Sequence, residues 1–218
     1  QERMAENRLY VFRNVKSGKE TFVCEIKSVP IGEFNNPKTN TIKFSKKSTG
    51  EHYLRITIQK IKTEIPLFIL FRALGIESDK DILLYILHDL DKEENEKYMQ
   101  FLTDTIENGE DVYTKEEAIE YLGKYVTKWS IRGEIKDNTW FVNQILNTEL
   151  FPHIGNTGNV IRNKAFYLGY MVKKMLCCYF GRLEYDDRDS YINKRADLPG
   201  ILIAGLFKQY WNLKLMKE

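Results

Sequence analysis

The spacing of apolar residues changes at Pro66, and this change limits the folds open to the chain more than any other feature of the sequence. Before Pro66, apolar and polar residues alternate, as they do along residues 53–58. Alternation places successive side chains on opposite faces of a strand. After Pro66, apolar residues recur every three or four positions, which is typical of helices. Strands followed by helices predict an α+β fold, with a small antiparallel sheet near the N-terminus followed by a mostly helical region.

Four strands are predicted in the first part of the chain. Gly-containing turns around residues 17–19 and 48–50 join them in pairs, as in antiparallel hairpins. The predicted strands are residues 9–12, 22–26, 41–44 and 53–58.

Several predicted helices begin with residues that stabilise a helix N-terminus. Pro66 suits the first position of a short helix, because proline lacks the N–H that a first turn leaves unpaired. Ser78 with Asp81 comes close to a capping box, whereas Thr114 with Glu117 is a full match.

The longest predicted helix follows a flexible break at residues 155–159, and its apolar stripe indicates a face packed in the core. The stripe consists of Ile161, Ala165, Leu168, Val172, Met175, Leu176 and Tyr179. Asp197 is predicted to be the N-cap of the last helix. Removing that helix should destabilise the chain, because its apolar residues are expected to be buried; these are Leu198, Ile201, Leu202, Leu206 and Phe207. The alternative is that the helix is an arm that belongs to a neighbouring domain, in which case its removal would leave the melting temperature unchanged.

Charge is segregated along the chain. The net charge is +7 over residues 1–62, −11 over residues 63–122 and +6 over residues 123–218. Two interpretations stay open: solvated surface throughout, or a basic face toward nucleic acid with an acidic face turned away. For the second, the candidate phosphate contacts cluster around one predicted turn and include no base-reading element; they are Lys43, Lys46, Lys47 and Arg55.

Signatures of common enzymes and metal sites are missing from the sequence. It contains no phosphate-binding P-loop, no nucleophilic serine elbow and no His-Glu-x-x-His pattern. The three cysteines form no CxxC pair, so free thiols are predicted rather than a zinc site. No apolar run approaches the roughly 20 residues of a membrane span. Because the chain does not begin with Met, we expect it to be part of a longer polypeptide.

The segment 186–200 combines acids and bases at high density. Three carboxylates lie within four positions, which is compatible with a magnesium site. A charged hinge is the favoured interpretation, because cations interrupt and follow the acids and the Gly and Glu of a calcium loop are missing. The charged residues are Asp186, Asp187, Arg188, Asp189, Lys194 and Arg195.

Several ordered blocks resemble one family. They are residues 1–3, 65–66, 71–76 (FRALGI), 78–83 (SDKDIL), 151–154 (FPHI), 162–171 (RNKAFYLGYM) and 186–200. Together they resemble the lobe of the second-largest subunit of multisubunit RNA polymerases, in its eukaryotic, archaeal and large-DNA-virus form. The sequence departs from the family at Ser190, Ile192 and Pro199, where His, Gly and Ala are usual. The resemblance implies a lobe over residues 1–185, and over 186–218 a junction and a helix leading into the protrusion.

The resemblance also implies a function. Such a lobe is non-catalytic, lines the DNA cleft and contacts initiation factors and other polymerase subunits. The polymerase as a whole is a nucleotidyltransferase whose magnesium is bound elsewhere, so no cofactor is expected in this chain. Weak DNA binding without sequence specificity is expected, with no membrane association. The compartment would be the nucleus, or the virion or cytoplasmic viral factory for a large DNA virus. The residues alone also allow a protein-interaction domain with no direct nucleic-acid role.

Overall fold

The computed structural model divides into two compact units, Glu6–Asp186 and Gln1–Ala5 with Asp187–Glu218. The structure describes residues 2–16, 19–30, 37–46, 52–107, 112–127, 137–155, 160–196 and 198–215.

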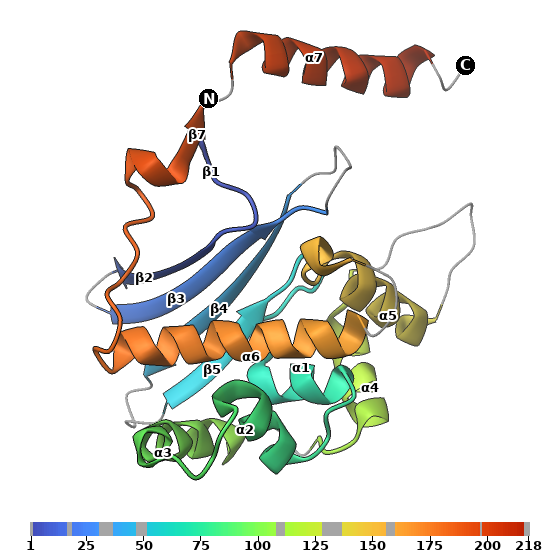
Figure 1. The fold of residues 1–218 in the computed structure, drawn as a ribbon. Coiled ribbons are helices and arrows are strands. Elements are labelled where there is room, and N and C mark those ends of the chain that lie inside the picture. Colours follow the sequence, from blue (N-terminus) through green and yellow to red (C-terminus); the bar gives the residue numbers. More distant parts are fainter. Residues whose placement is uncertain are drawn as a thin grey trace. The chain divides into compact units, whose positions relative to one another are not determined.

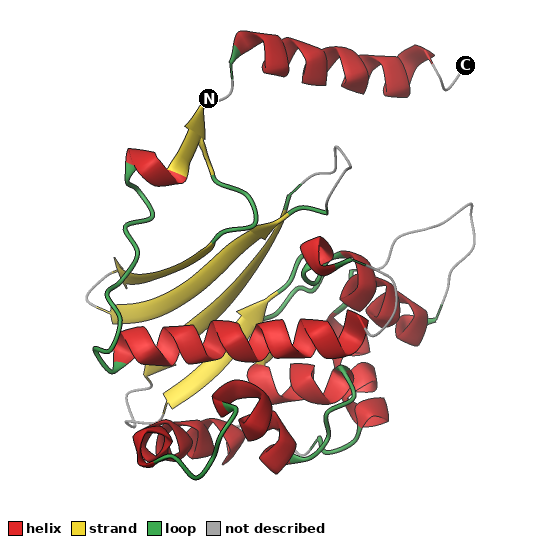
Figure 2. Cartoon of the chain, in the orientation of Figure 1, coloured by secondary structure: helices red, strands yellow, loops and turns green. Residues whose placement is uncertain are grey.

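A five-stranded antiparallel sheet forms the first part of the larger unit, and Figure 2 shows its strands in yellow. Its spatial order follows the chain: β2 (Leu9–Lys16), β3 (Lys19–Ser28), β4 (Lys38–Lys46), β5 (His52–Thr57) and β6 (Ile65–Pro66). The four predicted strands are therefore confirmed; β2, β3 and β4 are longer than predicted, and β5 begins and ends one residue earlier than predicted. The short β6 was not predicted, because two residues cannot show alternation.

The register of the sheet aligns a row of apolar residues across one face. Ile42 lies opposite Cys24 and Ile56, Cys24 lies opposite Val11, and Ile56 lies opposite Ile65. All five side chains are almost completely buried. This row fixes which face of the sheet meets the helices.

Six helices follow the sheet in the larger unit. They are α1 (Leu67–Ala73), α2 (Asp79–Leu87), α3 (Glu93–Glu107), α4 (Lys115–Tyr125), α5 (Asn138–Thr148) and α6 (Val160–Tyr179), with a short 3-10 helix, η1 (Pro152–Ile154), between the last two. Helix α6 crosses one face of the sheet and contacts β2 and β3, while α3 contacts β5 and α2 packs against α6 (Figure 1). The α+β prediction is confirmed. Among the described residues, no helix is both long and apolar enough to cross a membrane.

The stripe predicted on α6 is buried except near its two ends. Tyr179 is only partly buried, and the prediction for Ile161 is wrong, since its side chain is 46% exposed. In this first turn of α6, Val160 is buried instead, and Lys164 takes the next inward position. The apolar face is therefore rotated at the start of the helix.

The predicted helix starts have different outcomes. The capping box of α4 is confirmed, because Glu117 N donates to Thr114 Oγ1 at 3.3 Å and Thr114 N donates to Glu117 Oε2 at 3.1 Å. Ser78 is the N-cap of α2, but its side chain accepts no capping hydrogen bond, so the box predicted there is wrong. Pro66 occupies the N-cap of α1 rather than its first position.

The smaller unit pairs the start of the chain with a segment near its end. Strand β1 (Glu2–Met4) runs antiparallel to β7 (Lys194–Ala196), which follows the 3-10 helix η2 (Tyr191–Asn193). This pairing was not predicted, because three-residue strands carry no apolar pattern. Helix α7 (Pro199–Tyr210) continues into a π-helical turn, η3 (Trp211–Leu215).

Two predictions for the last helix are wrong. The N-cap of α7 is Leu198, because Pro199 takes the first helical position, and Asp197 itself lies outside the described residues. No residue of α7 is buried, although five apolar side chains were expected to be. The described residues of its own unit supply no layer that covers it.

Candidate nucleic-acid interface

Two of the four predicted phosphate contacts lie side by side on the sheet. Lys43 on β4 and Arg55 on β5 are register partners. Because side chains alternate along a strand, both project from the face opposite the buried row. Lys46 ends β4, but its side chain lies outside the described part of the structure, as does the whole of Lys47. The sheet therefore brings Lys43 and Arg55 together across two strands.

The Lys43 and Arg55 side chains differ in their interaction partners. Lys43 Nζ lies 2.5 Å from Glu64 Oε1, in a pair whose side chains are both 39% exposed. The Arg55 guanidinium lies 5.3 Å from the centre of the Tyr53 ring, and no carboxylate pairs with it among the described residues. Phosphate contacts depend on such cations. Of the two, Arg55 is the cation open to a phosphate.

The first acid of the 186–200 segment is tied to the larger unit. Asp186 Oδ2 accepts hydrogen bonds from Val11 N at 2.8 Å and from Lys174 Nζ at 2.9 Å. The carboxylate therefore links the end of this unit to β2 and α6. Its partner is a lysine of α6, which sequence reasoning did not identify.

The next acids organise a local turn. Asp187 Oδ1 accepts the backbone N–H groups of Asp189 at 3.1 Å and Ser190 at 3.2 Å. Asn193 Nδ2 donates to Asp187 O at 2.5 Å, which closes the segment on itself. Arg188 Nε lies 3.8 Å from Asp189 Oδ1. These contacts describe an acid-stabilised turn held by backbone donors.

Lys194 and Arg195, which follow the acids, contact backbone carbonyls and an aromatic ring. Arg195 donates to the backbone carbonyls of Ile192 at 3.4 Å and Lys194 at 3.1 Å, and Lys194 Nζ lies 5.5 Å from the Tyr191 ring centre. Within the described ranges, no group of three or more His, Cys, Asp or Glu residues is placed to hold a metal ion.

A buried carboxylate joins α5 to the sheet. The side chain of Glu149, at the C-cap of α5, is 2% exposed and pairs with Lys38 Nζ at 2.7 Å and Lys60 Nζ at 2.5 Å. Burial alone would raise the pKa of Glu149, but the hydrogen bonds and charges of the two lysines outweigh it and hold the pKa below its usual value. Sequence reasoning missed this site, because its members are far apart in the chain.

A buried lysine of α6 caps the C-terminal end of α5. Lys164 is fully buried, and its Nζ donates to Leu146 O at 2.8 Å and Asn147 O at 2.7 Å. These are carbonyls of the last turn of α5, which a cation satisfies well. Burial lowers the pKa of Lys164 to about 8. The available signal was a lysine on the inward side of an otherwise apolar helix face.

A buried arginine holds the loop before α4. Arg72, 3% exposed, pairs with Asp79 Oδ1 at 2.6 Å and donates to the Val112 carbonyl. Its guanidinium lies 5.3 Å from the Tyr113 ring centre. This residue therefore connects α1, the start of α2 and the segment leading to α4.

Ser28 and His153 form a hydrogen-bonded pair, but not a nucleophilic site. Ser28 Oγ accepts the backbone N–H of His153 at 3.0 Å, so its own proton is free to point at His153 Nδ1, 2.7 Å away. Ser28 is completely buried, which keeps a substrate from its hydroxyl. Burial also lowers the pKa of His153. The pair fastens β3 to η1.

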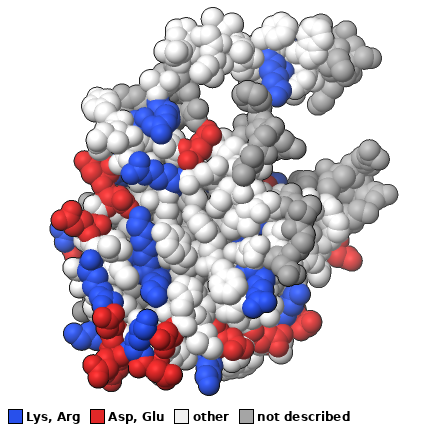
Figure 3. Space-filling view, in the orientation of Figure 1, with Lys and Arg blue, Asp and Glu red and all other residues white. Residues whose placement is uncertain are grey.

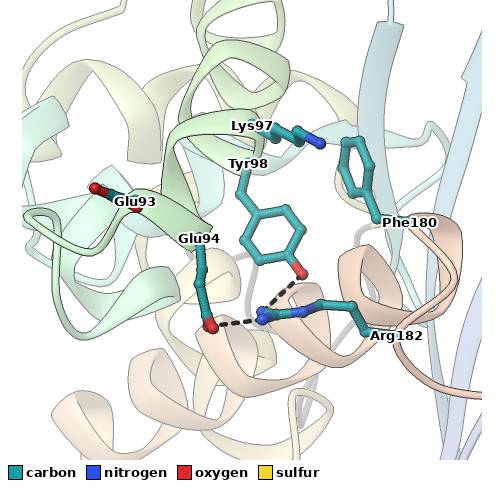
Figure 4. Close-up of a pocket in the computed structure, with 6 residues that line it drawn as sticks. All are labelled: Glu93, Glu94, Lys97, Tyr98, Phe180 and Arg182. Carbon is teal, nitrogen blue, oxygen red and sulfur yellow. Dashed lines mark hydrogen bonds and ion pairs between the residues drawn. The ribbon is translucent and has the colours of Figure 1, made fainter.

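A pocket of about 370 Å³ opens between the start of α3 and the residues after α6 (Figure 4). Arg182 spans its floor, with one nitrogen 2.6 Å from Glu94 Oε2 and another 3.3 Å from the Tyr98 hydroxyl oxygen. The Arg182 hydrogen bond lowers the pKa of Glu94. Because the guanidinium already contacts both neighbours, this floor ties α3 to the end of α6.

Charges are mixed on the face shown in Figure 3. Asp and Glu gather on its lower part, but Lys and Arg lie among them. The acid-rich segment 63–122 contributes α1–α4. On this face, the segregation seen along the chain does not become one uniformly acidic surface.

Comparisons with known proteins point to one family. The family model described as "RNA polymerase Rpb2, domain 2" matches residues 5–197. The chain is 34% identical over 223 residues to "DNA-directed RNA polymerase II subunit 2" of Arabidopsis thaliana, an alignment covering 100% of this chain and 18% of that protein. "DNA-directed RNA polymerase II subunit RPB2" of Encephalitozoon cuniculi is 37% identical over 95% of this chain and 17% of its own length. "DNA-directed RNA polymerase subunit 2" of Acanthamoeba polyphaga mimivirus is 32% identical over 98% of this chain and 19% of its own length. The chain thus spans less than a fifth of the length of these relatives.

Proposed function

Because the chain belongs to the RNA polymerase Rpb2 domain 2 family, we propose that it acts in transcription as the non-catalytic lobe of a DNA-directed RNA polymerase, lining the DNA cleft. The observation that carries the proposal is the family match over residues 5–197, together with relatives that align over 95–100% of the chain. The resemblance of residues 71–76 and 162–171 to the lobe supports the same conclusion.

The contacts that the buried charged side chains make within the chain support a scaffolding role. Glu149 joins α5 to the sheet, Lys164 closes the end of α5, and Arg72 holds the segment before α4. Each of these groups contacts other parts of the chain. They give the lobe a fixed shape, which a cleft wall requires.

The proposed DNA contact is electrostatic. Arg55 and Lys43 face away from the core, and a phosphate approaching Arg55 could also compete with Glu64 for Lys43. Few cations are available, so we expect affinity in the non-specific range, about 10⁻⁴–10⁻⁶ M, falling as salt rises. Binding should be indifferent to sequence.

A fluorescence titration with duplex DNA at two salt concentrations tests this contact. Arg55→Glu should weaken binding, whereas Lys124→Glu, at an exposed position on α4, should not. Equal binding by both variants would rule out this face. No binding by the unmodified chain, even at low salt, would favour the alternative of a factor-docking domain with no direct nucleic-acid role.

Assembly tests the wider proposal. Other polymerase subunits are the proposed obligatory partners, initiation factors are proposed further partners, and the nucleus or a viral factory is the proposed compartment. Residues 5–197 would replace the matching segment of the Encephalitozoon cuniculi subunit. The chimera should co-purify with the other subunits and transcribe. A chimera carrying the matching archaeal segment, from a relative 32% identical to this chain, controls for sequence distance. The assignment would be contradicted if the chimera with residues 5–197 failed while the archaeal chimera assembled and transcribed.

A further inference from the structure

Strand β2 forms one edge of the five-stranded sheet (Figure 1). In an antiparallel pair, every second residue directs its N–H and C=O groups away from the partner strand. On β2 these residues include Val11, because its N–H and C=O groups bond to Asp186 and not to β3. By the same alternation, Leu9, Arg13 and Val15 also present their backbone groups to the edge.

The first half of this edge is covered by the chain itself. Val11 N donates to Asp186 Oδ2 at 2.8 Å, and Asp186 N donates to Val11 O at 2.7 Å. Lys174 Nζ donates to Leu9 O at 3.3 Å. Contacts of this kind keep a second extended chain from pairing with the strand, as proteins commonly do at the edges of their sheets.

The second half of the edge is open. Among the residues that the structure describes, none accepts from the backbone N–H groups of Arg13 and Val15 or donates to their C=O groups. The Val15 residue is also 60% exposed, and β2 contains no proline over Leu9–Lys16. Two donors and two acceptors therefore face outward in the spacing of a strand. An extended segment satisfies this pattern by adding a strand to the sheet.

The side chains beside the open edge indicate what such a segment contains. Arg13 and Val15 lie on the same face of β2 as the buried Val11. Phe22, the register partner of Arg13, stacks with the Tyr185 ring at 6.0 Å. An added strand would place every second side chain on this face. An apolar, β-branched residue beside Val15 would shield it from water and form a favourable cross-strand pair.

Four charged side chains near the open edge are already paired with one another. Arg13 Nη1 lies 3.3 Å from Glu20 Oε1, and Lys174 Nζ lies 2.9 Å from Asp186 Oδ2. A charged residue of an incoming segment would meet both signs and gain little from either pair. An uncharged segment therefore complements this edge best.

A second copy of the chain matches the edge less well. If Arg13 and Val15 of two copies paired with each other in an antiparallel register, each Val15 would lie opposite an Arg13. A charged side chain would then stand where the exposed valine favours an apolar one. A different chain can supply an apolar residue at that position.

We propose that the edge of β2 at Arg13 and Val15 binds an uncharged, extended segment of another protein, which adds an antiparallel strand to the sheet. Its β-branched side chains would lie beside Val15, and its backbone would bond to both residues. This edge is separate from the proposed DNA contact, because Lys43 and Arg55 lie on β4 and β5 and project from the opposite face of the sheet. Neither interaction depends on the other.

Nuclear magnetic resonance of the isotope-labelled full chain tests the proposal with three blocked hexapeptides. The first alternates Val and Thr. The second carries N-methyl groups on its Val amides, which face β2 when the Val side chains lie beside Val15, and the third carries them on its Thr amides, which face away. The first and third should shift the amide signals of Arg13 and Val15 and bind within about threefold of each other. The second should bind at least about tenfold more weakly, because it lacks the donors toward β2.

Variants of Val15 complete the experiment. Val15→Pro removes an N–H that the pairing of β2 with β3 does not use, so the sheet should stay folded while the first peptide binds at least about tenfold more weakly. Val15→Thr keeps the N–H and a β-branched side chain, and its affinity should stay within about threefold. Melting temperatures show whether each variant is folded. If Val15→Pro is not, the two methylated peptides still decide the question.

Several outcomes would overturn the proposal. They are equal binding by the two methylated peptides, no binding of the first peptide at about 1 mM, and signal shifts confined to residues outside β2. Sedimentation of the chain alone measures self-association. A dimer that is lost in Val15→Pro would show that a second copy occupies the edge, and this too would overturn the proposal.

Discussion

Helices α6 and α7 are both rich in apolar residues, but the structure buries only one of them. Ten of the 20 residues of α6 are buried, whereas none of the 12 residues of α7 is. The difference lies in the surroundings, since α6 contacts β2, β3 and α2, while α7 contacts the turn that continues it. An apolar stripe therefore shows that a helix has a face to cover, but not that the same unit supplies the cover.

The largest expected effect comes from a matched pair of truncations in these helices. Leu168→Ala in α6 should lower the free energy of unfolding by about 2–5 kcal/mol, because it opens a cavity at a fully buried position. Leu206→Ala in α7, at a side chain 55% exposed, should cost no more than about 0.5 kcal/mol. Denaturant unfolding of both variants measures the contrast. Equal losses would show that α7 is packed as firmly as α6.

The next effect concerns the charged anchor of α5. Glu149→Gln should destabilise the chain by about 1.5–3 kcal/mol near neutral pH, because it leaves Lys38 and Lys60 without their shared carboxylate. The pKa of Glu149 is lowered on folding, so its contribution is present above the unfolded pKa and is lost as pH falls through the folded value. Unfolding measured from neutral to acid pH should show the variant losing less stability than the parent. If the free energies of unfolding of the variant and the parent fell in parallel with pH, this role of Glu149 would be contradicted.

Lys164 should give a smaller effect, in an alkaline rather than an acid pH range. Its pKa falls from 10.5 to about 8 on folding, so the unfolded chain binds more protons between these values. Stability contributed by this group should therefore rise as pH increases from about 8 toward 10.5. Lys164→Met should flatten that rise. Lys124→Met, at an exposed site, is the control and should preserve it.

The smallest effect belongs to the smaller unit. Asp189→Ala should change the free energy of unfolding by about 0–1 kcal/mol, because the Arg188–Asp189 pair is exposed and its closest atoms are 3.8 Å apart. We also expect no stoichiometric magnesium binding by the acids at 186–189, since backbone donors and Lys174 already contact Asp187 and Asp186. Calorimetric detection of one bound magnesium, lost in Asp187→Ala, would overturn this expectation.

Sequence patterns predicted local structure better than they predicted contacts. The four strands and the Thr114 capping box are confirmed, because each signal lies within a few consecutive residues. The prediction for Ile161 failed because helix periodicity gives the direction of a face but not its rotation at the first turn. Of the predicted phosphate contacts, the structure describes the side chains of Lys43 and Arg55, and it shows that Lys43 is already paired.

The sequence by itself determined that strands precede helices, where several of these elements begin, and to which family the chain belongs. Alternation, helical spacing and ordered motifs are all local properties of the chain. Only the tertiary structure decided which groups the charged side chains contact: Lys43 contacts Glu64, Glu149 contacts Lys38 and Lys60, and Asp186 contacts Val11. These partners lie from 21 to 175 positions apart. Their contacts depend on sheet register and helix packing, which no local pattern specifies.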